Sequence, residues 1–115
     1  MVKRGDIILI TIPFSDLTSS KVRPALVLSP EDQSENDLIV ALITTNIHRP
    51  LRATDHPIRT GEKDFAATGL RQDSVFRMSK IFNLDKTLAK RRLGRVPPAL
   101  MKKLAAKLKV ALGIR

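Results

Sequence analysis

The sequence predicts a mainly β fold with helical additions, formed as one domain over residues 1–115. Three apolar runs, at residues 7–12, 25–28 and 38–43, have the length of buried strands. A later segment repeats leucine every four residues, which is the spacing of one face of a helix. At 115 residues the chain can bury one modest core but not two.

The first half of the chain predicts strands joined by polar loops. Residues 5–12 are rich in isoleucine and end at Pro13, which predicts the first strand. Residues 14–22 are polar and predict a loop, after which residues 25–28 and 38–43 predict two further buried strands.

The second half predicts one edge strand, one half-exposed strand and a helix. Residues 47–68 predict loops around an edge strand near Ile58, and residues 69–74 predict a turn into the half-exposed strand. The run of cations at residues 90–92 is typical of a solvated face.

The final segment carries both the start and the end signals of a helix. Pro97 and Pro98 are compatible with a first helical turn, and Gly113 can end the helix in the left-handed conformation. One apolar stripe is formed by Leu100, Leu104, Leu108 and Leu112. This stripe predicts a helix that covers the core.

Charge is the strongest compositional feature. Lys and Arg number 21 against 11 Asp and Glu, which gives a net charge of +10 and a pI near 10.7. Such an excess attracts polyanions, of which nucleic acid is the commonest in the cytosol. Because the only aromatic residues are four phenylalanines, an RNA contact must rely on phosphates and polar groups more than on stacking.

Composition also limits the compartment and the chemistry. The absence of cysteine excludes disulfides and thiolate metal sites. No stretch approaches the roughly 20 apolar residues of a membrane helix, and the first residues lack the apolar segment of a signal peptide. We therefore expect a cytoplasmic protein with no membrane partner.

Arg23 is the first candidate functional residue. Pro24 fixes its own φ and favours an extended backbone at Arg23, so the guanidinium would leave the sheet at a defined angle. Arginine offers five donors in one plane and stays charged, which suits a phosphate that must be held in one orientation. The same residues fit a surface arginine at a strand entrance equally well.

Thr44 is the second candidate and follows the third predicted strand directly. A hydroxyl at the end of a rigid strand can donate to a phosphate oxygen. Threonine at a strand end more often bonds the neighbouring backbone. Both interpretations stay open on the residues alone.

Two other groups of residues give weaker signals. The acidic residues of segment 30–37 match no oxygen-ligand loop and include no glycine, so we predict a solvated loop, no metal site and no cofactor. His48 and His56 could be the acid and base of a ribonuclease, since histidine titrates near neutrality. Nothing in the sequence places them together.

Several motifs, in their order and spacing, resemble the MazF/PemK family of toxin endoribonucleases. They comprise residues 3–7, residues 22–29, Ile43 with Thr44, Gly69 with Leu70, residues 73–75, Ile81, and a turn at Gly94 and Arg95 before the final helix. The resemblance covers nearly the whole chain. It implies an SH3-like β-barrel of the MazF/PemK/CcdB type with a C-terminal helix, a homodimer, and a cognate antitoxin protein as partner.

The resemblance also implies an activity, which is metal-independent, sequence-specific cleavage of single-stranded mRNA to 2′,3′-cyclic phosphate and 5′-hydroxyl ends. The family's catalytic arginine falls on Arg23 and its catalytic threonine on Thr44. Because the adjacent 2′-hydroxyl is the nucleophile in this chemistry, the protein needs mainly to orient the phosphate and stabilise its charge. The general base stays unassigned, since a guanidinium with a pKa above about 12 is a poor base.

The RNA contacts that the resemblance implies lie in the first loop, after the third strand and in the half-exposed strand. These residues are Ser15, Thr18, Ser19, Ser20, Lys21, Thr45, Asn46, Arg77, Ser79 and Lys80. Many relatives have Gly-Gly in place of Ser20 and Lys21, and some have Glu-Gln in place of Ser79 and Lys80. We therefore expect a stiffer, more basic first loop that contacts both RNA and antitoxin.

Two other classes of function stay open. SH3-like barrels also carry binding functions, and related toxins block a topoisomerase. The chain could thus be a non-catalytic toxin that binds nucleic acid or a topoisomerase, or an inactive homologue that binds antitoxin. All of these would be basic dimers, so charge cannot separate them.

Overall fold

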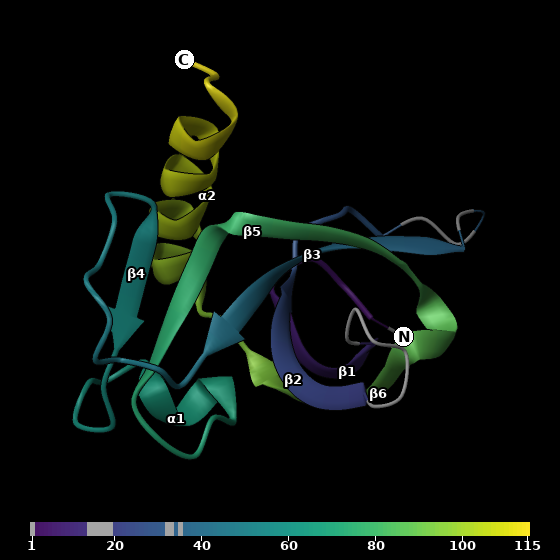
Figure 1. The fold of residues 1–115 in the computed structure, drawn as a ribbon, viewed down its shortest axis with the longest axis horizontal. Helices are drawn as coiled ribbons and strands as arrows, with labels where there is room; N and C mark the ends of the chain where they lie inside the picture. Colours follow the sequence, from purple (N-terminus) through teal and green to yellow (C-terminus); the bar gives the residue numbers. More distant parts are fainter. Residues whose placement is uncertain (1, 14–19, 32–33, 35) are drawn as a thin grey trace.

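The computed structural model describes residues 2–13, 20–31, 34 and 36–115 as one curved antiparallel sheet with helices beside it (Figure 1). The strands are β1 (Asp6–Pro13), β2 (Ser20–Val27), β3 (Asp37–Thr44), β4 (Asp55–Ile58), β5 (Ser74–Asp85) and β6 (Ala89–Arg95). The helical elements are α1 (Phe65–Thr68), the 3-10 turn η1 (Lys86–Leu88) and α2 (Pro98–Leu112).

The order of the strands in the sheet is β4-β5-β3-β2-β1-β6. β1 and β2 curl below β3 and β5, and β6 runs beside β1 (Figure 1). The predicted mainly β fold with a C-terminal helix is confirmed. The sheet is not closed by strand pairing, because β4 and β6 remain its edges.

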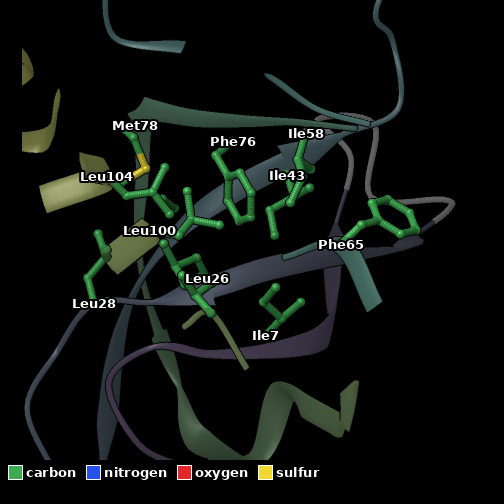
Figure 2. Close-up of a cluster of buried hydrophobic side chains, with 12 residues drawn as sticks. Ile7, Leu26, Leu28, Ile43, Ile58, Phe65, Phe76, Met78, Leu100 and Leu104 are labelled. Atoms are coloured by element: carbon green, nitrogen blue, oxygen red, sulfur yellow. The ribbon is translucent and has the colours of Figure 1, made fainter. Parts of the chain in front are cut away.

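Two apolar clusters cover opposite faces of the sheet. Successive residues enter different clusters, as Ile7 and Ile8 do in β1, because side chains alternate along a strand. The larger cluster lies between β5, β2 and α2, where Phe76 and Leu26 pack near Leu104 (Figure 2). The sheet is therefore held from both sides, and its strand ends form a rigid frame.

Helix α2 confirms the predicted start, end and apolar stripe. Pro98 occupies its first turn and Gly113 ends it with φ +72°. Leu100 and Leu104 are buried, whereas Leu112 is 55% exposed, because the helix extends past the sheet (Figure 1). The stripe thus covers the core along only part of its length.

The structure corrects three local predictions. Residues 20–22, predicted as loop, belong to β2, because the hairpin pairing with β1 continues to Ser20 opposite Pro13. The predicted turn at residues 94–95 lies within β6, whereas the run at residues 90–92 of the same strand is exposed, as predicted. The short helix α1 forms inside a segment predicted as loops and one edge strand.

Strand β6 forms through backbone pairing with β1, although its composition does not predict a strand. Its residues are largely exposed cations, yet their backbone groups pair with β1 from Asp6 opposite Arg95 to Ile10 opposite Ala89. The edge position tolerates charged side chains, which also discourage pairing with other chains. Among the described residues, no helix is both long and apolar enough to cross a membrane.

Candidate nucleic-acid interface

Arg23 lies within β2 and not at its entrance. On one side it is opposite Ile10 of β1. On the other side the pairing of β2 with β3 runs from Val27 opposite Val40 to Ala25 opposite Leu42. The same register, continued by two residues, places Arg23 opposite Thr44 at the end of β3. Alternation along the two strands puts both side chains on the same face of the sheet.

Pro24 explains why the ladder stops at this point. Proline has no N–H to donate, and pairing with β3 ends at the next residue, Ala25. Ala25 and Leu26 are fully buried, so the strand that carries Arg23 is anchored immediately after it. Arg23 itself is partly exposed, and its guanidinium is thus accessible from solvent on a fixed backbone.

Thr44 serves the backbone and still has a hydrogen to donate. Its hydroxyl oxygen accepts a hydrogen bond from the Asn46 N–H at 3.1 Å. A hydroxyl that accepts one bond can still donate its own hydrogen to another oxygen. The structural role predicted for a strand-end threonine is therefore present, and it is compatible with a phosphate contact.

A hollow of about 350 Å³ opens beside these strand ends. Pro24 and Thr45, the residues that follow the two candidates, form part of its wall. Its floor is apolar, and its rim carries polar and cationic side chains, namely Arg71, Gln72, Ser74 and Arg91. By the same alternation, Pro24 and Thr45 lie on the face of the sheet opposite to the side chains of Arg23 and Thr44. The hollow therefore carries two arginines that the sequence did not single out, on the other face of the sheet from the two candidates.

Two glycines bring the walls of this hollow together. A Cβ on Gly69, which has φ +72°, would lie 2.0 Å from the backbone oxygen of Leu93. A Cβ on Gly94 would lie 2.4 Å from the backbone carbon of Thr68. Only glycine allows α1 and β6 to approach this closely. The sequence offered two signals, the turn at residues 69–74 and the cation run, but nothing that joined them.

The predicted contacts in the first loop are only partly described. Ser15, Thr18 and Ser19 lie outside the described residues. Ser20 opens β2, and Lys21 is exposed opposite Ile12.

Thr45 and Asn46 are exposed directly after β3, next to Thr44. Among the described members of the predicted contact set, Lys21 lies two residues before Arg23, and Thr45 and Asn46 directly follow Thr44.

Ser79 and Lys80 lie in an irregularity of β5, away from Thr44. Ala41 is opposite Ile81 and Leu42 is opposite Arg77, so residues 78–80 are inserted between two successive pairs. Both side chains are exposed. Thr44 is opposite Val75, at the other end of this part of the ladder, so the structure does not bring Ser79 and Lys80 to the hollow.

Arg77 differs from the prediction that it contacts RNA. It is 3% exposed, and its Nε donates to Asp55 Oδ1 at 3.0 Å. Asp55 comes from β4, 22 residues earlier, which the sequence could not place. A sealed ion pair of this kind leaves no guanidinium for a ligand, and we exclude Arg77 from the site.

The two histidines do not form a described pair. His56 of β4 lies 3.1 Å from the Lys107 ammonium of α2, while His48 is exposed in the loop after β3. Burial is the main reason why the pKa of His56 lies below its ordinary value, and Lys107 lowers it further. Among the described residues, no group of three or more His, Asp or Glu could hold a metal ion.

Fold and site together define a small, strongly basic β protein with an arginine in the middle of β2 and a hydroxyl at the end of the neighbouring strand β3. The family described as "PemK-like, MazF-like toxin of type II toxin-antitoxin system" matches residues 3–112. The chain therefore belongs to this toxin family. The comparison with curated protein sequences gives no match.

Solved structures agree with this assignment. An endoribonuclease in complex with its cognate antitoxin from Mycobacterial species is 25% identical, over 100% of this chain and 98% of that chain, with a TM-score of 0.72. The Mycobacterium tuberculosis toxin MazF-mt6 is 25% identical over 94% of this chain and 98% of that chain, with a TM-score of 0.70. MazE-MazF from Deinococcus radiodurans is 19% identical over 99% and 98%, with a TM-score of 0.74, and supports the fold alone.

Proposed function

We propose that the protein acts in the cytoplasm as a type II toxin that cuts single-stranded mRNA without a metal ion. The observation that carries the proposal is the register of β2 with β3 in a member of this toxin family: continued by two residues beyond its last pair, Ala25 with Leu42, it would set Arg23 opposite Thr44. Similar chains that are named endoribonucleases support the type of reaction. The net charge of +10 supports a polyanionic substrate.

In the proposed reaction the 2′-hydroxyl oxygen attacks the adjacent phosphorus, and the bond from phosphorus to the 5′-oxygen breaks. The proton of the 2′-hydroxyl passes to a base that we leave unassigned, and the 5′-oxygen takes up a proton. The products carry a 2′,3′-cyclic phosphate and a 5′-hydroxyl. No water is consumed in this step, so the protein must mainly hold the phosphate in line.

Arg23 and Thr44 divide the work on the phosphate. The guanidinium of Arg23 stabilises the negative charge that accumulates on the nonbridging oxygens. The Thr44 hydroxyl donates to one of these oxygens while Asn46 N–H holds it in place. By comparison with oxyanion-hole donors, each group would supply about 3 kcal/mol of transition-state stabilisation.

The proposed RNA contacts extend from these two residues to the segments next to them in the chain. From the predicted set we retain Ser15, Thr18, Ser19, Ser20, Lys21, Thr45 and Asn46 next to these two residues, and Ser79 and Lys80 as separate contacts farther along β5. Arg71, Gln72 and Arg91 line the hollow on the other face of the sheet, and an RNA that passes around the strand ends would contact them as well.

The decisive experiment is cleavage of a long single-stranded RNA in excess EDTA. We expect the parent protein to cut it, and Arg23→Ala and Thr44→Val to lose most of the activity. Arg59→Ala and Thr60→Val are matched controls, since both residues are exposed and neither one lines the hollow or belongs to β2 or β3. Intact RNA with the parent protein would favour the non-catalytic binding function, and equal cleavage by Arg23→Ala would remove Arg23 from the mechanism.

Control of the toxin is expected to use the same cationic surface. We propose that the antitoxin brings an acidic, initially flexible segment that lies across the site, as disordered acidic segments can fold onto basic grooves. Raised salt should then weaken the complex. An affinity that is the same at low and high salt would contradict this form of control.

The homodimer stays a prediction, for which the fold offers one surface. An apolar hollow of about 350 Å³ is lined by Leu28, Ile39, Ile81, Leu108 and Leu112, with Ser29 and Pro30. Asp37 and Asp85, opposite each other in the sheet, flank its strand side, and Lys109 flanks its helix side. We propose that a second copy packs here about a twofold axis, which sets acidic flanks against basic ones.

Light scattering can test this dimer surface. Leu112→Glu should convert dimers into monomers, because it places a carboxylate in the apolar hollow. Val110→Glu is the control, since Val110 is 64% exposed on the same helix and does not line the hollow. A dimer that survives Leu112→Glu would exclude this surface.

A further inference from the structure

The Asp6 carboxylate organises a group of cations at the start of β1. Asp6 is 2% exposed, and its Oδ1 atom accepts from Arg95 Nη1 at 2.7 Å and pairs with Arg92 Nε at 3.2 Å. Its Oδ2 atom accepts the backbone N–H of Lys3 at 2.8 Å. One buried acid thus fixes two arginine side chains from β6 and the backbone before β1.

Part of this arrangement is structural. The ion pairs hold the start of β1 against the end of β6, where Asp6 and Arg95 are opposite each other. Burial of Asp6 requires such partners, because an unpaired buried carboxylate is costly. The contacts from Lys3 and Arg95 already supply one donor to each oxygen of Asp6.

Arg92 and Arg95 have more donors than this structural role uses. Each guanidinium carries five N–H donors, and these contacts direct one nitrogen of each to Asp6. The side chains are 52% and 48% exposed. A hollow of about 530 Å³ is lined by Lys3, Asp6, Arg92 and Arg95. Three cationic side chains therefore line one open space with a single carboxylate, which is already bonded.

We propose that Lys3, Arg92 and Arg95 form a phosphate-binding site that holds a phosphodiester of the RNA away from the bond that is cut. Planar guanidiniums in fixed positions suit phosphate oxygens, and side chains that are already held lose little freedom on binding. This assignment depends on the proposed function for its ligand but not for its geometry.

The position of the site predicts which RNAs use it. Asp6 lies four residues along β1 from Ile10, which is opposite Arg23, and this corresponds to roughly 13 Å of strand. A short RNA that fills only the candidate catalytic site would not reach Asp6. A longer RNA can place a distal phosphate there, so the site should contribute to affinity only above a certain length.

The test uses RNA with 2′-O-methyl groups throughout, which cannot be cut by its own 2′-hydroxyls. Affinities of a short and a long oligonucleotide are measured over a range of salt concentrations. Arg92→Gln should weaken binding of the long RNA by roughly 3- to 10-fold at low salt and lower the slope of log affinity against log salt by about 1. Binding of the short RNA should not change.

Lys90→Gln is the matched control, because Lys90 is exposed two residues earlier on β6 and does not line the hollow. Arg92→Gln is expected to fold, since Arg95 and Lys3 still bond Asp6. Arg92→Lys, which keeps the charge and loses the planar fork, should bind the long RNA with intermediate affinity. If Arg92→Gln matches Lys90→Gln at both lengths and every salt concentration, the site does not bind RNA.

Inorganic phosphate is the second probe. Phosphate binding that Arg92→Gln abolishes, with unchanged affinity for long RNA, would overturn the assignment to RNA in favour of a free phosphate.

The cleavage assay separates this inference from the proposed function. If the parent protein cleaves RNA but Arg92→Gln does not weaken binding of the long RNA, only the distal site is refuted. If Arg92→Gln weakens binding of the long RNA but the parent protein does not cleave, only the nuclease activity is refuted.

Discussion

Two arginine–carboxylate clusters on the same sheet differ in how much arginine they leave to solvent. Arg77 and Asp55 pair one to one at 3.0 Å, and their side chains are 4% and 0% exposed. Arg92 and Arg95 share the Asp6 carboxylate and stay about half exposed. A sealed pair can only stabilise the fold, whereas a shared, open cluster can also bind a ligand. The number of cations in the sequence therefore exceeds the number that can bind RNA.

The largest expected loss of stability comes from removing one partner of the buried Arg77–Asp55 ion pair. Arg77→Met should lower the free energy of unfolding by about 3–5 kcal/mol, because it leaves Asp55 buried and unpaired. Urea unfolding measures this loss, with Arg59→Met as an exposed control. A loss as small as that of the control would show that Asp55 is hydrated and that the pair is not sealed.

At Arg23 we expect a large loss of activity and little loss of stability, because this residue is partly exposed and is proposed to contact the reacting phosphate. Arg23→Gln should lower kcat/KM for RNA cleavage by about 10²–10³-fold, with a change in unfolding free energy below about 1 kcal/mol. Steady-state kinetics and urea unfolding on the same sample test both parts. A stability loss as large as that of Arg77→Met would place Arg23 in the structural class.

Loss of the open cluster around Asp6 should lower the free energy of unfolding by less than Arg77→Met and by more than Arg23→Gln. Asp6→Asn should cost about 1–3 kcal/mol, since the freed arginines can be solvated. Burial would raise the pKa of Asp6, but the hydrogen bonds from Lys3 N–H, Arg92 and Arg95 together hold that pKa below its ordinary 3.8.

The Asp6 contribution should therefore be complete above about pH 3.8 and be lost as the pH falls through the folded-state pKa. Unfolding free energies of the parent and Asp6→Asn, compared across acidic pH, provide the test. Parallel curves would mean that the pKa of Asp6 is the same in the folded and unfolded chains.

The smallest expected effect is the change in stability with pH that comes from His56, whose ring lies 3.1 Å from the Lys107 ammonium. Burial, Lys107 and Lys103 lower the pKa of His56 from 6.5, and Glu62 opposes them. The unfolded chain then takes up a proton first, so stability should decrease as the pH falls below about 6.5. His56→Gln should remove this decrease in thermal midpoint, and His48→Gln should keep it. If His56→Gln changes nothing, another group causes the decrease.

The sequence alone determined the elements that carry their own local signals. The isoleucine-rich and apolar runs specify β1, β2 and β3, because burial of such residues requires a sheet face. The proline start, leucine stripe and Gly113 specify α2. The order of motifs predicted Arg23 and Thr44 as a catalytic pair only through its resemblance to the family, and this pair stays a prediction.

Only the tertiary structure decided which charged residues are partners and which are free. Asp55 and Arg77 are 22 residues apart, and Asp6 and Arg95 are 89 apart. Strand β6 forms because β1 offers its edge, and residues 78–80 are inserted between two successive pairs of β5 with β3. Side-chain chemistry is local, whereas burial and pairing depend on groups from distant segments, and this is why the roles of Arg77, Arg92 and Arg95 could not be read from their positions in the chain.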